Sequence, residues 1–80
     1  MSEPDPETVV ETAYEAAEHV IFEHFDTSQV RDLDITATFR EGVFEIDVYL
    51  NAGGHPDEQD VVEAASEAAM RAVDYLFDNF

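Results

Sequence analysis

Residues 33–50 read LDITATFREGVFEIDVYL and contain two runs in which apolar and polar side chains alternate. The apolar positions are Leu33, Ile35, Ala37 and Phe39 in the first run and Phe44, Ile46, Val48 and Leu50 in the second. Successive side chains of a strand point to opposite faces of its sheet, so each run predicts a strand with one apolar face. The intervening Glu41-Gly42 predicts a tight turn, and the whole segment therefore predicts a β-hairpin.

The predicted register of the hairpin follows from the turn. A two-residue loop pairs Phe39 with Phe44 and brings every other apolar residue of the first strand opposite an apolar residue of the second. A shift by one residue would place apolar side chains opposite acidic ones and mix the two faces. Because Glu-Gly is a weaker hairpin dipeptide than Asn-Gly, a four-residue loop in the same register is the alternative. We expect strands over about 32–40 and 43–51.

Amphipathic segments flank the hairpin on both sides. Asp5-Pro6 is typical of a helix start, with Asp as the N-cap and Pro at the first helical position, and predicts a helix over about 5–25. A second helix is expected over about 56–78, after the Gly53-Gly54 break. The predicted inner residues are Val10, Ala13, Ala17, Val20, Ile21 and Phe25 in the first helix and Val62, Ala65, Ala69, Ala72, Val73, Leu76 and Phe80 in the second.

The order of these segments predicts the fold class. A chain of 80 residues has room for one domain, which we expect to span 1–80. We predict an α+β fold of helix, β-hairpin and helix, in which both helices pack on one face of the antiparallel hairpin. A lone hairpin leaves two open edges, so dimerisation could extend the sheet. The chain has no cysteine, and neither a disulfide nor a thiolate zinc site can stabilise it.

The charge of the chain restricts its partners and its habitat. The chain has twenty acidic residues, three arginines and no lysine, and its net charge is −17. This balance is typical of cytoplasmic proteins adapted to concentrated salt, where the Debye length falls to about 3 Å at 1 M. It disfavours direct binding to nucleic acid or anionic membranes, which requires basic side chains. The longest apolar run, residues 20–22, is too short for a membrane helix or a secretory signal.

Residues with catalytic or metal-binding chemistry form no convincing pattern. Glu15, His19 and Glu23 share one helical face and could hold a divalent ion, but without cysteine or a second spaced histidine we favour a solvated charged ridge. Gly53-Gly54 precedes a helix, yet the following acidic residues would repel a phosphate, and we interpret the pair as a turn. We expect His55 to help cap the second helix. The sequence thus predicts a protein that is not an enzyme, with no catalytic, cofactor-binding or metal-binding residue and no cofactor.

The remaining features indicate association with a protein partner or a second copy of the chain. The first strand carries few charges, which favours it as the edge for strand addition. The C-terminal aromatic residues exceed what one inner face can hide, so they either fold over the end of the sheet or form a subunit interface. The candidate interface residues are Ile35, Ala37, Phe39, Tyr75, Phe77 and Phe80.

Three stretches, Val30–Ile35, Phe44–Leu50 and Ala72–Phe77, resemble a small archaeal family of unknown function in its haloarchaeal form. That family is in turn similar to the small dimerising (Pcc-type) subunits of the KEOPS complex, which makes the threonylcarbamoyladenosine modification of tRNA. The resemblance implies a non-catalytic accessory subunit that completes such a dimer, and it carries over no catalytic residues. The KEOPS subunits begin with a strand ahead of their first helix, whereas we expect no strand within Met1–Pro4.

Two alternatives remain open. The first is a KH-like module that contacts RNA, since small α+β domains often do so. The predicted outer face of the hairpin is net acidic, which disfavours this function; it comprises Thr36, Thr38, Arg40, Glu45, Asp47 and Tyr49. The second is a halophilic domain with a weak metal site on the first helix.

Overall fold

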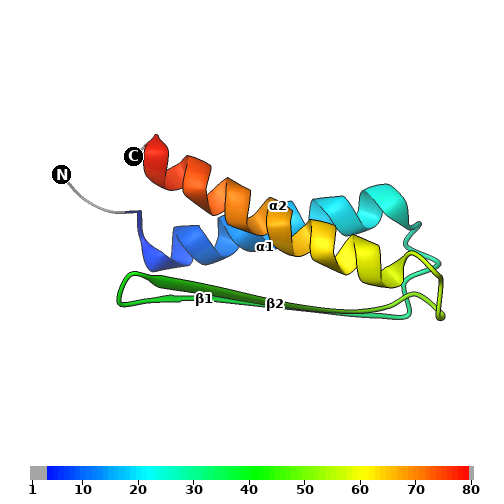
Figure 1. Cartoon of the computed structure of the whole chain (residues 1–80). Coiled ribbons are helices and arrows are strands. Elements are labelled where there is room, and N and C mark those ends of the chain that lie inside the picture. Colours follow the sequence, from blue (N-terminus) through cyan, green and yellow to red (C-terminus); the bar gives the residue numbers. More distant parts are fainter. Residues whose placement is uncertain (1–3, 80) are drawn as a thin grey trace.

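The computed structural model describes residues 4–79 and shows two helices on one face of a β-hairpin (Figure 1). The elements in chain order are α1 (Pro6–His24), β1 (Asp32–Arg40), β2 (Val43–Asn51) and α2 (Glu58–Asp78). The two strands form an antiparallel sheet, and the predicted α+β fold of helix, hairpin and helix is confirmed. Residues 1–3, on which the question of an N-terminal strand depends, lie outside the described part, as does Phe80.

The hairpin has the expected register and a two-residue loop. Phe39 pairs with Phe44, and Arg40 and Val43 flank the turn. Glu41 and Gly42 have φ angles of 53° and 78°. Positive φ at both central residues defines a type I′ turn, whose twist matches that of the strands it joins. The loop therefore has two residues, and the four-residue alternative is wrong.

Local signals place the ends of α1. The side chain of Asp5 accepts a hydrogen bond from the backbone N–H of Glu7 at 3.1 Å, and Pro6 occupies the first turn. At the other end the N–H of Phe25 donates to the carbonyl of Ile21 at 2.9 Å, and the chain then becomes extended. The predicted N-cap is thus confirmed, and it satisfies one of the backbone donors that a helix leaves free at its start.

The core lies where the two helices meet above the sheet. Each helix buries one straight row of side chains, namely Val9, Ala13, Ala17 and Ile21 in α1 and Val61, Ala65, Ala69 and Val73 in α2. Alanine at the centre of both rows allows the helices to approach closely. α1 packs over β1 and α2 over β2, and the strands add Ile35 and Leu50 to the buried set.

The predicted inner faces of the helices need one correction. Val10 and Val62 were expected inside, but Val9 and Val61 occupy the buried rows, while Val10 and Val62 are only half-buried. Three further residues expected inside are likewise half-buried, namely Val20, Ala72 and Leu76. Each helix must face its partner helix and the sheet together, so its buried row points between them. Both valine pairs are adjacent in sequence, and only this packing direction chooses one member of each pair.

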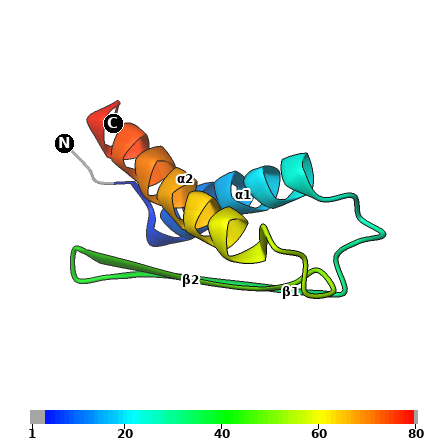
Figure 2. The same cartoon turned by 45° about the vertical axis from the view of Figure 1, so that its right-hand side comes forward.

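Within residues 4–79, no helix or strand covers the second face of the sheet. Figures 1 and 2 show both helices on the same side of the hairpin, and no helix or strand among residues 4–79 lies on the other side. The principal dimensions are 45 × 19 × 17 Å, so the molecule is long and narrow. In this part of the chain the two-stranded sheet has two free edges, and the backbone N–H and C=O groups along these edges are accessible to a partner strand.

Candidate protein-interaction site

Both edges of the hairpin expose backbone hydrogen-bonding groups. The type I′ turn makes Arg40 and Val43 a hydrogen-bonded pair, and bonded and non-bonded pairs alternate along an antiparallel ladder. The residues whose N–H and C=O groups point away from the other strand are therefore those with inward-facing side chains: Leu33, Ile35, Ala37 and Phe39 on β1 and Phe44, Ile46, Val48 and Leu50 on β2. No hydrogen bond recorded for residues 4–79 outside the ladder engages these groups.

The predicted interface residues lie in different environments. Ile35 belongs to the core with 9% of its surface exposed, so it can offer a partner only its backbone. Ala37 and Phe39 are half-buried beneath the helices, and Phe77 is half-buried against the core. Tyr75 is 70% exposed. Phe80 lies outside the described residues.

Two hollows lie along the border between α2 and β2, and the sequence patterns did not predict them. The one near the turn has a volume of about 300 Å³ and is lined by Phe39, Gly42, Phe44, Val73, Asp74 and Phe77. The other, near the start of α2, has a volume of about 320 Å³ and is lined by Val48, Tyr49, Leu50, Glu58, Gln59 and Val62. Each hollow combines residues of α2 with residues of the strands, so it could be recognised only once α2 is placed over β2.

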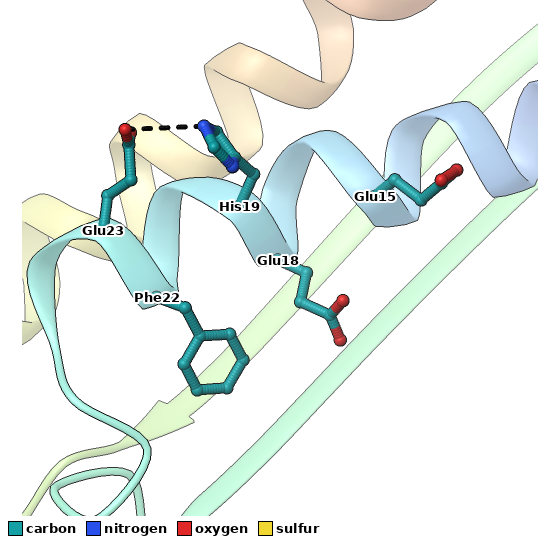
Figure 3. Close-up of a pocket in the computed structure, with 5 residues that line it drawn as sticks. All are labelled: Glu15, Glu18, His19, Phe22 and Glu23. Atoms are coloured by element: carbon teal, nitrogen blue, oxygen red, sulfur yellow. Dashed lines mark ion pairs between the residues drawn. The ribbon is translucent and has the colours of Figure 1, made fainter.

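The proposed ion-binding face of α1 forms a third, acidic hollow of about 420 Å³ (Figure 3). Nε2 of His19 lies 3.4 Å from a carboxylate oxygen of Glu23, and both side chains are mostly exposed. Figure 3 shows Glu18 and Phe22 pointing to one side of the helix and His19 and Glu23 to another. Within residues 4–79, no three His, Asp or Glu side chains are placed where they could hold a metal ion together.

The Gly-Gly loop before α2 is closed by the protein itself. The Glu58 carboxylate accepts hydrogen bonds from the backbone N–H groups of Ala52 at 2.9 Å and Gly54 at 3.0 Å. The N–H of Gly53 donates to the side-chain oxygen of Asn51 at 3.0 Å. The three successive donors that could have cradled a phosphate are therefore occupied, which supports the interpretation of this loop as a turn.

His55 stabilises the same loop between β2 and α2. Its Nδ1 accepts a hydrogen bond from the backbone N–H of Asp57 at 3.1 Å, next to the first turn of α2. The imidazole also lies edge-on to the ring of Phe25, with centroids 5.2 Å apart and planes at 79°. His55 thus bonds the N–H of the N-cap residue Asp57, whose own side chain makes no capping hydrogen bond, and its ring joins the end of α1 to the start of α2.

These observations define a small acidic α+β protein with an open hairpin as its candidate interaction site. Residues 1–76 match the family described as protein of unknown function (DUF3194), and the chain belongs to that family. An uncharacterised protein of Natronomonas pharaonis is 43% identical over 76 residues, which cover 95% of this chain and 92% of that relative. No solved structure gives a significant match. Neither helix in the described part is long and apolar enough to cross a membrane.

Proposed function

We propose that this protein is a non-catalytic accessory subunit that acts through contacts with another protein. The observation that carries the proposal is the two-stranded sheet, whose edges are both free and whose outer face is bare within residues 4–79. Free strand edges are ready templates for another strand. An 80-residue fold with so small a sheet also gains stability when a partner covers part of it.

The finer proposal is that the partner is the small dimerising subunit of an archaeal KEOPS complex in the cytoplasm. It is supported by the resemblance of Val30–Ile35, Phe44–Leu50 and Ala72–Phe77 to the family related to those subunits. The order of helix, hairpin and helix is compatible with it. In this role the protein would complete a dimer and leave the tRNA chemistry to the catalytic subunit.

The test is reconstitution with a purified haloarchaeal KEOPS small subunit in molar KCl. Size-exclusion chromatography with light scattering should show a complex with one copy of each chain, and native mass spectrometry should give the same composition. The small subunit mixed with an unrelated acidic protein of similar size is the control. Separate elution of the two proteins would contradict the KEOPS assignment.

The proposal includes no direct contact with RNA. The outer face of the sheet presents Glu45 and Asp47 beside Arg40, and all three are exposed. Since phosphate binding depends on basic side chains, we expect a filter-binding titration with tRNA at molar salt to retain no RNA with this chain alone. Saturable retention would favour the KH-like alternative instead.

A further inference from the structure

The surroundings of the two hairpin edges differ. α1 lies over β1, and Figure 3 shows the charged side chain of Glu18 beside Phe22 on the side of α1 that faces the hairpin. α2 lies over β2 and carries four uncharged residues on one side, which we call the uncharged ledge: Val62, Ser66, Met70 and Phe77. Met70 is 51% exposed. Asp74 follows Met70 by one helical turn and lines the same hollow as Phe77, so an acidic residue borders the ledge at that end.

Val62 and Phe77, the two ends of the uncharged ledge, lie beside the free edge of β2. Val62 shares a hollow with Val48 and Leu50, and Phe77 shares another with Phe44. The two hollows thus place the ledge alongside the strand at both of its ends. The backbone N–H and C=O groups of Ile46 and Val48 point out beside this ledge, so an added strand would find hydrogen-bonding groups and apolar surface together.

The charges around this edge specify the chemistry of the added strand. Its alternate side chains would lie against the ledge on the helix side and beside Glu45 and Asp47 on the outer side. The complementary strand therefore has apolar residues on one face and basic residues on the other.

A second copy of this chain does not provide such a strand. Its β2 would place Glu45 and Asp47 next to the same acidic residues. Its β1 carries Asp32 and Asp34 against the single Arg40. Like charges on neighbouring strands destabilise their pairing. The charge pattern thus favours a different protein as the occupant.

We infer that β2 is the docking edge of this protein and that it binds a partner strand in which apolar residues alternate with basic ones. The inference rests on the proposed function, because it names the surface through which the accessory subunit would bind. The sequence analysis favoured β1 as the docking edge because β1 carries few charges. The structure favours β2 instead, because an added strand contacts the helix above the edge as well as the edge strand itself.

The test uses a synthetic peptide as long as β2 that alternates valine with arginine, at the lowest KCl concentration that keeps the chain folded. Amide hydrogen exchange measured by NMR should show new protection of Ile46 and Val48, with Ile35 and Ala37 unchanged. A peptide of the same length that alternates valine with glutamate should give no protection. Protection of β1, equal binding of the acidic peptide, or no binding would overturn the inference.

A matched pair of variants separates the ledge from general charge effects. Met70→Arg places a cation on the ledge and should weaken binding of the valine–arginine peptide by at least about tenfold. Tyr14→Arg makes the same change in charge on α1 and should leave the affinity unchanged. Both side chains are exposed, at 51% and 41%, and circular dichroism should show that both variants fold. Equal losses in the two variants would contradict a site on β2.

Two outcomes separate this inference from the KEOPS assignment. Protection of β2 by the peptide, without co-elution of the KEOPS small subunit, would support the docking edge and contradict the named complex. Co-elution with the small subunit, with protection at β1 instead of β2, would support the complex and overturn the docking edge. A homodimer of the chain alone with protected β2 amides would also overturn it, because the occupant would then be a second copy.

Discussion

The ring of Phe39 on β1 packs against the ring of Phe77 on α2, with centroids 5.4 Å apart and planes inclined by 57°. α2 otherwise lies over β2, so this contact ties the last turns of the chain to the first strand. Both residues are half-buried and line the hollow near the turn. The pair therefore serves the stability of the fold and also shapes one end of the proposed docking edge.

Phe77→Ala should lower the free energy of unfolding by about 2 kcal/mol, less than for a fully buried phenylalanine, because part of the ring already faces solvent. A double-mutant cycle with Phe39→Ala should give a coupling of about 0.5–1.5 kcal/mol. Urea unfolding followed by circular dichroism measures both values. Tyr75→Ala, at a position 70% exposed, is the control and should change stability by less than about 0.5 kcal/mol. Additive losses at Phe39 and Phe77 would show that the ring contact contributes nothing of its own.

Glu58→Ala should destabilise the protein by about 1–3 kcal/mol, because the backbone N–H groups of Ala52 and Gly54 lose a charged acceptor. The amides of Ala52 and Gly54 should also exchange faster with solvent. Glu63→Ala on the exposed side of α2 is the matched control, and thermal unfolding of both variants gives the comparison. If both variants lost the same stability, the cause would be helix charge and not the loop.

Glu41→Asn should raise the free energy of unfolding by about 0.5–1 kcal/mol. Glu41 has a φ of 53°, and asparagine tolerates this left-handed conformation better than glutamate and is preferred before glycine in type I′ turns. Glu41→Gln removes the same charge without that conformational gain and should have little effect. Equal gains from glutamine and asparagine, measured by urea unfolding, would attribute the effect to charge.

Ala17→Leu should destabilise the fold by about 1–3 kcal/mol or prevent it from forming. Ala17 has no exposed surface and lies in the row where the helices meet, so the three extra side-chain carbons of leucine must push them apart. Glu11→Leu introduces the same residue on an exposed position of α1 and should leave the fold intact. Circular dichroism and thermal unfolding distinguish these outcomes, and a stable Ala17→Leu variant would contradict the close helix contact.

Lowering the salt concentration should unfold the protein. A net charge of −17 on 80 residues repels itself strongly when counterions are dilute, and molar KCl screens that repulsion. The helical circular dichroism signal should fall on dialysis into dilute buffer and return when KCl is restored. A matched concentration of sucrose controls for general effects of cosolutes. An unchanged signal in dilute buffer would contradict adaptation to salt.

The local features of this fold could be read from the sequence. The register of the hairpin followed from alternation over residues 33–50, since a slip by one residue would have exchanged the two faces. The start of α1 followed from Asp5-Pro6, whose capping chemistry involves only near neighbours. The class of fold then followed, because two amphipathic helices had one apolar sheet face to cover.

Only the tertiary structure decided which member of each valine pair is buried, and that two hollows form where α2 borders β2. Val9 and Val61 are buried because of the direction in which each helix packs against its neighbours. The periodic pattern of apolar residues does not specify this direction. The uncharged ledge of α2 lies beside the edge of β2 only because α2 packs over β2. The physical reason is that backbone periodicity and capping act over a few residues, whereas burial and edge environment depend on contacts between segments far apart in the chain.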